Sequence, residues 1–474
     1  MSDHKNRKDR HLPVRPNLDQ LKHQAKELLR DIRRGDPSAI QEFDKYHPKG
    51  IPRDAGGAPV VPVNACETPA VNAAEAPPAV RIDAGETLAI PVNALEQVTL
   101  ADAQLALARS YQVSSWPRLV QACKLIDAIW RDDTHAVRDL VVKNPHLLHE
   151  MARGTKKCNW GPPMSYAANL GRDQIIKMLH ELGATDIESA IDRATLQSKI
   201  GTARILHEMM GSPRPPDGAL GGPAYTLSVS GTALMFEFGA QVLNANCKRL
   251  APVDVVLETD SREPSAKHEI LEMYVRHGLE LPDTPTMALH RGRIDLLEKH
   301  LSRGPGLLHR TFKHEEIYPP EFGCHDEVLA THGTPLAGAT LLHMCVDYDE
   351  MEIARWLLER GMDVDARSAV DTHGFGGHTA LFATVMSQPN YWMNHGGKPQ
   401  VAPFTQLLLD HGADPNARAS LRKQLHPGYG PKYDVDTLPE YRDVTPLSWG
   451  KRFHAKVFVS APGMRLIAER GGHE

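Results

Sequence analysis

Histidine is the residue type in this chain that most clearly suggests chemistry, since 25 of the 474 residues are histidines. Many of them lie with cysteines in one part of the chain, in the order Cys324, His325, His332, His343, Cys345, His373, His378, His395 and His411. Neutral imidazoles and thiolates are the ligands that zinc prefers in proteins. If the intervening loops fold together, one hypothesis is a metal-dependent or small-molecule-binding enzyme with a site near residues 324–395.

The spacing of these residues matches no known catalytic motif. No two histidines stand four residues apart with a glutamate between them, as zinc enzymes with an HExxH helix require. The chain also has no GxSxG nucleophile elbow and no Walker phosphate loop. Cys324 lies beside His325, but adjacency in sequence does not give the geometry of a catalytic pair. The alternative is therefore that these side chains are structural or solvent-exposed, and we expect no catalytic residue, cofactor or metal.

Composition narrows the class of partner. The formal net charge is -5, so the chain as a whole has no electrostatic drive toward nucleic acid. No apolar run reaches the roughly 20 residues that a membrane helix needs. The six cysteines are scattered, as in proteins of a reducing compartment. We therefore expect a monomeric cytoplasmic protein with a protein partner, and neither nucleic acid nor membrane as partner.

Changes of composition along the chain predict four parts. Residues 1–16 are rich in charge and are expected to form a basic, disordered tail. Residues 17–48 and 98–127 carry apolar side chains at helical spacing, and we expect them to pack together as an N-terminal helical cap. Residues 49–97 are dominated by Ala, Pro and Val without a helical period, which indicates an insertion or linker. Residues 128–474 form the remaining part.

One pattern recurs in this last part. It is clearest in residues 333–367, GTPLAGATLLHMCVDYDEMEIARWLLERGMDVDAR, and variants begin at Thr379, Thr445 and, more weakly, Gly161. The threonine hydroxyl can cap a first helix, and proline is tolerated in its first turn. Gly361 follows the second helix, where a left-handed conformation would strain any residue with a Cβ. Each unit therefore reads as helix–turn–helix, and its recurrence predicts a stacked repeat array.

The amino-acid pattern of these units resembles the ankyrin repeat. WLLERGMDVDAR and LLLDHGADPNAR look like the second helix and following turn of that family, and the resemblance extends over residues 128–474. The chain is also similar to bacterial ankyrin-repeat proteins through RPNLDQLKHQAKELL and DAQLALARSYQVSSWPRL. This resemblance implies an all-α fold: a degenerate ankyrin-repeat solenoid with long loop insertions, preceded by a small N-terminal helical region. It also implies a protein-binding module.

Stretches outside the repeats are where we expect binding specificity. They span about residues 311–332, 368–377, 387–403 and 419–443. Loops on a rigid scaffold often carry function, and aromatic side chains are favoured at interfaces. The candidate interaction surface consists of aromatic and histidine residues: Tyr318, His325, His343, Phe375, His378, Tyr391, Trp392, Tyr429 and Tyr433. The alternative for the aromatic residues is that they fold back over the repeats as a secondary core.

The predicted function is a protein-binding scaffold or adaptor that uses the concave face and long loops of the array, without catalysis. The enzyme with a His/Cys site stays open as the alternative. An inhibitory role, in which the array blocks rather than recruits its partner, is a third hypothesis that rests on the scaffold alone.

Overall fold

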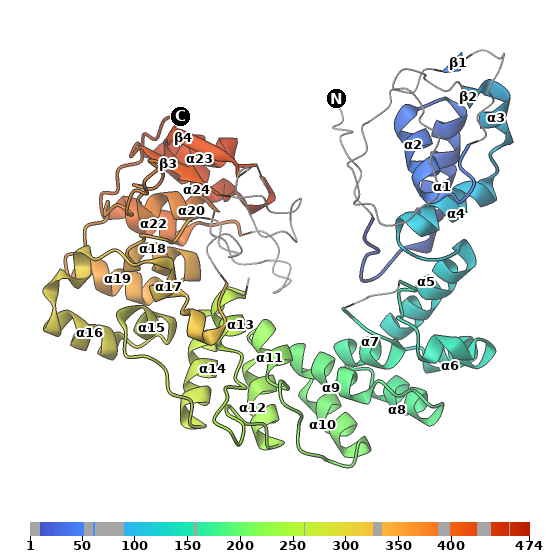
Figure 1. Cartoon of the computed structure of the whole chain (residues 1–474), viewed down its shortest axis with the longest axis horizontal. Coiled ribbons are helices and arrows are strands. Elements are labelled where there is room, and N and C mark those ends of the chain that lie inside the picture. Colours follow the sequence, from blue (N-terminus) through green and yellow to red (C-terminus); the bar gives the residue numbers. More distant parts are fainter. Residues whose placement is uncertain are drawn as a thin grey trace, which may run out of the picture. The chain divides into compact units, whose positions relative to one another are not determined.

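The computed structural model describes nine stretches of the chain. They are residues 10–51, 60–61, 90–155, 159–259, 261–325, 334–386, 399–423, 438–454 and 456–474. The chain divides into two compact units, residues 1–193 and 194–474, which are described separately below. Figure 1 labels the helices and strands along the chain. Both units are mostly helical, in agreement with the all-α expectation. Within the described residues, no helix is both long and apolar enough to span a bilayer.

Unit 1 consists of helices with one two-residue strand pair. Its elements are α1 (Leu18–Arg33), α2 (Pro37–Tyr46), β1 (Val60–Val61), β2 (Ile90–Pro91), α3 (Val92–Gln97), α4 (Leu100–Ser110), α5 (Trp116–Trp130), α6 (Thr134–Lys143), η1 (Pro145–Leu148), α7 (Pro163–Leu170), α8 (Asp173–Glu181) and most of α9 (Ile187–Leu196). The strands β1 and β2 pair antiparallel.

The sequence specifies the N-terminal helices through their caps and apolar stripes. The side chain of Asn17 accepts hydrogen bonds from the first backbone amides of α1, and Asp36 does the same for α2. One face of α1 is buried, including Leu21 and Ile32. The helix α1 contacts α2 and α4, so helices from both sides of the 49–97 stretch share one core. The helix α3 also joins this core through Leu95, so the end of the expected linker is folded.

Residues 10–16, which we call the strap, differ from the expected disordered tail. Leu12 and Pro16 are buried, and the backbone amide of Arg10 donates to the carbonyl of Ser110. Buried and exposed residues alternate along residues 12–16, and the chain bends at Val14 and Arg15, so the strap is an irregular segment lying against the helices. Residues 1–9 lie outside the described residues.

Helix pairs follow the N-terminal helices in unit 1. The helix α5 contributes Leu119 and Cys123 to the N-terminal core, and it also pairs with α6 and contacts α7. The pair α7 and α8 comes next, with Gly171 ending α7 in a left-handed conformation. Pairing therefore begins one helix earlier than the 128–474 boundary suggested.

Unit 2 continues with helix pairs. Its elements are the end of α9, α10 (Ile200–Met209), α11 (Gly221–Tyr225), α12 (Val229–Glu237), α13 (Val253–Glu258), α14 (Pro264–Arg276), α15 (Pro285–His290), α16 (Ile294–Arg303), η2 (Pro305–His309), α17 (His314–Ile317), η3 (Pro320–Phe322), α18 (Leu341–Tyr348), α19 (Met351–Glu359), α20 (Ala380–Met386), α22 (Pro403–Asp410), β3 (Ala419–Arg422), β4 (Glu440–Val444), α23 (Pro446–Arg452), η6 (Lys456–Phe458) and α24 (Ala461–Glu469).

The expected repeat signals occupy the expected positions in unit 2. Thr445 caps α23, and Pro446 stands in its first turn. Gly361 and Gly412 follow α19 and α22, both with φ of 88°, the left-handed region predicted for them. The first helices of successive pairs contact each other, as do α18 with α20 and α20 with α23. Stacking of this kind covers the apolar face that a single pair leaves exposed.

Two strands modify the all-α expectation in unit 2. The strands β3 and β4 pair antiparallel and enclose most of the predicted 419–443 stretch, with a register shift between Ala419 and Leu421. Burial alternates along β3, with Ala419 and Leu421 facing the core. Alternation of this kind is the period of a half-buried strand, which is why the helical repeat pattern stops there.

Candidate functional site

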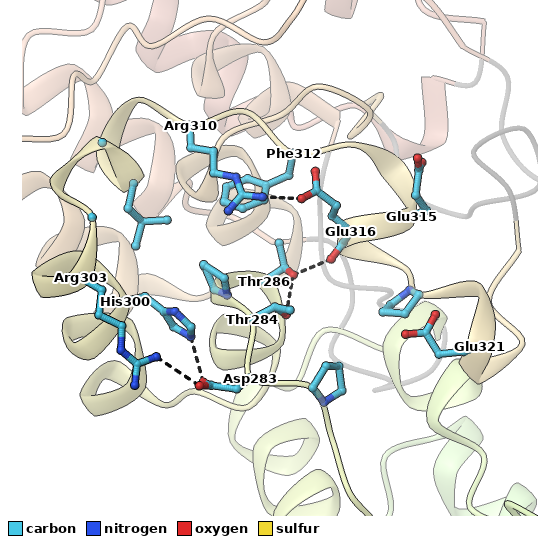
Figure 2. Close-up of a pocket in the computed structure, with 16 residues that line it drawn as sticks. Asp283, Thr284, Thr286, His300, Arg303, Arg310, Phe312, Glu315, Glu316 and Glu321 are labelled. Carbon is cyan, nitrogen blue, oxygen red and sulfur yellow. Dashed lines mark hydrogen bonds and ion pairs between the residues drawn. The ribbon is translucent and has the colours of Figure 1, made fainter.

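An open pocket of about 700 Å³ lies in unit 2 beside the inserted 311–325 segment (Figure 2). We call it the acidic pocket. Its lining comes from the segment leading into α15, the end of α16, η2, α17 and η3. The lining residues are Pro282, Asp283, Thr284, Pro285, Thr286, His300, Arg303, Gly304, Gly306, Leu307, Arg310, Phe312, Glu315, Glu316, Pro319 and Glu321.

One wall of the pocket carries Asp283 with two side chains from the last turns of α16. Arg303 Nη1 donates to Asp283 Oδ2 at 3.3 Å, and His300 Nε2 lies 3.0 Å from Oδ1 without hydrogen-bond alignment. The Arg303 hydrogen bond and the nearby His300 lower the pKa of Asp283. Asp283 is therefore ionised at neutral pH and already has a cationic neighbour, Arg303, from the chain itself.

The opposite wall is built by the short helix α17. Glu316 Oε1 accepts from Arg310 at 2.5 Å, while its Oε2 accepts from the backbone amide of Lys313 at 2.8 Å. The Arg310 guanidinium also lies over the Phe312 ring, 4.7 Å from its centre. Thr286 of α15 donates to the backbone carbonyl of Glu316. The carboxylate of Glu316 is thus occupied by its own surroundings.

Two further acidic side chains line the pocket. Glu315 and Glu321 are exposed and make no hydrogen bond or ion pair within the described residues. Figure 2 shows both on the side of the pocket opposite Asp283, His300 and Arg303. With Asp283 and Glu316, the lining holds four carboxylates against two arginines, an excess of two negative charges when His300 is neutral. The pocket is therefore suited to a ligand that carries positive charge.

The inserted segment is fixed to the rest of unit 2 by backbone contacts. Phe312 pairs with Ala339 through an amide-to-carbonyl hydrogen bond of 2.8 Å, and Gly338 donates back to Phe312 at 2.7 Å. At the other end, the His325 amide donates to Glu258 at the end of α13. Both ends of the wall are thus held, which keeps α17 in position.

His343 and His378 come together, as the zinc hypothesis required, but their ring nitrogens are already occupied. His343 Nε2 donates to the carbonyl of His378 at 3.0 Å, and its Nδ1 accepts from Thr340 Oγ1 at 2.9 Å. His378 Nε2 donates to the carbonyl of Pro335 at 3.1 Å, and its Nδ1 is 2.8 Å from Ser368 Oγ. A metal ligand needs a free imidazole lone pair, which neither ring offers in this arrangement.

Burial also keeps both rings neutral. It lowers the pKa of His343 to about 4 and that of His378 to about 3. Their side chains are part of the interior, so neither belongs to an exposed interaction surface. Among the described residues, no group of three or more His, Cys, Asp or Glu side chains could hold a metal ion.

The other predicted surface residues lie in different surroundings. Tyr318 is 2% exposed and its hydroxyl pairs with that of Tyr348, and Phe375 is 5% exposed. For these two the structure corresponds to the alternative of a secondary core. Arg442 lies over the Phe375 ring at 4.3 Å. The remaining predicted aromatic residues lie outside the described residues, as do two of the histidines: Tyr391, Trp392, Tyr429, Tyr433, His332 and His395.

His325 is the one described member of the predicted surface with an exposed side chain. Its Nδ1 lies 2.7 Å from Glu258 Oε2, so the ring is hydrogen-bonded to that carboxylate. Burial raises the pKa of the neighbouring Cys324 thiol, which disfavours the thiolate that a nucleophile needs. The adjacent pair therefore lacks the features of a catalytic dyad.

A cluster of buried charges lies between α14 and the α18–α19 pair. Lys267 Nζ of α14 is 2.8 Å from Glu350 Oε1, and His268 Nε2 lies at the same distance from that oxygen. Burial lowers the pKa of Lys267, whereas Lys267 and His268 hold the pKa of Glu350 down against the effect of its burial. Glu350 follows α18, so these contacts join α14 to the α18–α19 pair. We interpret the cluster as structural.

Sequence reasoning missed the residues of the acidic pocket. Aromatic and histidine residues were favoured as interaction sites, whereas the pocket presents Glu315, Glu321 and Asp283. A usable signal existed in the stretch RTFKHEEIYPPEF, which interrupts the repeats and is dense in charge. Glutamates in such a stretch are equally typical of a solvated loop, so the pattern alone did not single them out.

Comparison with known proteins locates one family match. The model of the ankyrin repeat matches residues 337–369, which contain α18 and α19. No curated protein matches the chain. Among solved structures, the ankyrin repeat domain of human ASB11 is 16% identical, with 66% of this chain and 99% of that chain covered and a TM-score of 0.21. The family match supports the ankyrin resemblance inferred from the sequence at the repeat where that resemblance is clearest.

Proposed function

We propose that this chain is a non-catalytic protein-binding module, and that the acidic pocket receives a partner segment bearing lysine or arginine side chains. Ankyrin repeats generally mediate protein–protein interaction, and one such repeat, at residues 337–369, directly follows the insertion that builds the pocket. The single observation that carries the proposal is the pair of carboxylates, Glu315 and Glu321, that have no partner within the described residues, at an open pocket whose other charges are paired.

The chemistry of the pocket favours a side chain over a free ion. Its walls include Leu307 and Phe312 besides the carboxylates, so a long aliphatic stem with a cationic end could contact both kinds of surface. Exposed charge pairs are individually weak, and two of them are needed for appreciable selectivity. A partner with two basic residues would satisfy both glutamates.

Selection from a peptide display library against the immobilised full chain tests this proposal. We expect the enriched peptides to carry lysine or arginine, and their binding to weaken in high salt. Substitution of both Glu315→Gln and Glu321→Gln should weaken binding about tenfold, because two charge-assisted contacts of roughly 0.7 kcal/mol each are lost. The matched control is Glu469→Gln, an exposed glutamate on α24 outside the pocket, which should bind like the wild type.

Enrichment of acidic or purely apolar peptides, or binding that ignores both glutamates, would contradict the assignment of the pocket. If no peptide is enriched, the same double substitution can be compared with wild type in quantitative capture of proteins from a lysate. Equal capture by the wild type and the double variant would then refute the assignment of the pocket as the binding site. Absence of any stoichiometric partner would count against protein binding itself.

A further inference from the structure

The strap in unit 1 contacts the helices in the way that a bound peptide contacts a binding domain. Arg153 Nη1 donates to the carbonyl of Leu12 at 3.0 Å, and the Tyr166 hydroxyl donates to the carbonyl of Val14. These donors hold the backbone carbonyls of two strap residues that stand two positions apart. Backbone contacts of this kind do not depend on the identity of the bound side chains.

The side chains of the strap also alternate. Leu12 and Pro16 are buried, Val14 is partly buried, and His11 and Arg15 are exposed. The strap therefore presents its apolar side chains to the surface beneath it. It thus combines backbone recognition with apolar contacts, as bound peptides do.

Arg15 adds a charged contact at the edge of this surface. Its Nη2 donates to Asp127 Oδ1 at 2.8 Å, and its guanidinium lies 5.5 Å from the centre of the Trp130 ring. Trp130 belongs to a row of three aromatic rings, since Trp160 stacks on it at 6.4 Å and contacts Tyr166 at 4.8 Å. An aromatic row next to a carboxylate is suited to an arginine.

The Arg15 contact is exposed, and so it is weak. The side chain of Arg15 is 49% exposed and that of Asp127 is 45% exposed. An ion pair in this environment is screened by solvent, and a cation–π contact at an exposed site is similarly modest. A second segment of the same chemistry could therefore compete for this surface.

We propose that Asp127, Trp130, Arg153 and Tyr166 form a binding site for a partner segment that, like the strap, has apolar residues at alternate positions together with an arginine. The strap is the intramolecular occupant of this site and limits access to it. The site lies in unit 1, so it is independent of the acidic pocket in unit 2 and of the function proposed there.

A fluorescein-labelled peptide with the sequence of residues 10–17, RHLPVRPN, tests this site in the full chain. Fluorescence anisotropy would compare wild type with Arg15→Ala. Loss of one exposed ion pair and one cation–π contact from the strap should tighten binding of the peptide about five- to tenfold. A peptide whose arginine at position 15 is replaced by alanine should lose a similar factor.

Two further variants decide between a binding site and a purely structural strap. Arg138→Ala removes a comparably exposed arginine that pairs with Glu181 at 3.7 Å, and should leave peptide binding at the wild-type level. Adding Asp127→Ala to Arg15→Ala should abolish the gain. Hydrogen exchange at the amides of residues 10–16 reports whether the strap loosens in each variant.

If Arg15→Ala accelerates exchange in the strap but binds the peptide no better than wild type, the surface is only a packing surface and the proposal is overturned. Equal binding and unchanged exchange would overturn it as well, because Arg15 would then contribute nothing to occupancy. If the peptide still binds more tightly than to wild type after Asp127→Ala is added, it binds at another site.

Discussion

The buried ion pair between Lys267 and Glu350 provides the sharpest test of how unit 2 is held together. Their side chains are 3% and 4% exposed, and the nitrogen and oxygen lie 2.8 Å apart. The Lys267 ammonium also lies 4.1 Å from the centre of the Tyr348 ring. Glu350→Gln preserves the size of the side chain while removing its charge, so it isolates the electrostatic contribution.

The expected loss of stability follows from this geometry. At an effective dielectric constant of about 20, two charges 2.8 Å apart attract by about 6 kcal/mol. Desolvation of both groups offsets most of this energy in the wild type, so the intact pair contributes little. Removing one partner leaves the other charge buried and uncompensated, which costs about 3–5 kcal/mol. We therefore expect Glu350→Gln to lower the free energy of unfolding of unit 2 by that amount.

The sign of the pH dependence gives an independent check. Burial already lowers the pKa of Lys267, and loss of Glu350 lowers it further. Folded Glu350→Gln then binds fewer protons than its unfolded chain below the ordinary lysine pKa of 10.5. Its stability should therefore rise with pH, and the deficit relative to wild type should be smaller at pH 9 than at pH 6.

Urea unfolding followed by circular dichroism, with hydrogen exchange in α14 and α18, measures this loss. Glu298→Gln is the matched control, because Glu298 is 52% exposed and pairs with Arg360 at 2.6 Å; we expect a loss within about 1 kcal/mol. The double substitution Lys267→Met with Glu350→Leu should recover most of the stability. A loss below about 1 kcal/mol for Glu350→Gln, or a double variant less stable than the single one, would refute the electrostatic reasoning.

Three further predictions concern the repeats of unit 2. Burial lowers the pKa of His343 from 6.5 to about 4, so its contribution to stability is complete above pH 6.5 and is lost as the pH falls toward 4. Urea unfolding between pH 7 and 4 should show a decrease in the free energy of unfolding of about 3 kcal/mol from this residue. If this decrease is absent, the folded ring carries a proton. Gly376→Ala should destabilise unit 2 by about 3 kcal/mol or more in thermal unfolding, because φ is 117° and the new Cβ would collide with the carbonyl of Ala369. Gly361→Ala, at φ 88° in open space, should cost about 1 kcal/mol. Equal losses for the two variants would contradict the steric argument. Thr445→Ala should remove about 1 kcal/mol by deleting a helix cap, and a neutral result in urea unfolding would show the cap to be dispensable.

The sequence predicted the helix pairs because their signals are local. Asn17 caps the start of α1 and Gly412 follows the end of α22, and each acts within one helical turn. The sequence around each residue is therefore enough to predict its role. The apolar stripe of α19 is local in the same sense, and Ile353 and Leu357 from that stripe are buried as its spacing requires.

The candidate site could not be predicted in the same way, because it depends on contacts between distant residues. His343 and His378 stand 35 residues apart, and only the fold shows that each donates to a backbone carbonyl rather than to a metal. Asp283 and Glu315 meet at one pocket only because the insertion folds back beside α15 and α16. Spacing along the chain does not show which distant residues come together in the fold.

The distribution of satisfied and unsatisfied polar groups in unit 2 indicates where binding can be altered without unfolding the protein. His343, His378 and Glu350 are buried with their polar atoms engaged, so substitution there removes stability first. Glu315 and Glu321 are exposed and lack partners within the described residues, so their loss leaves no buried group unpaired. A variant of these two glutamates that unfolds as late as wild type but binds more weakly would therefore separate recognition from folding, a separation that the histidines cannot provide.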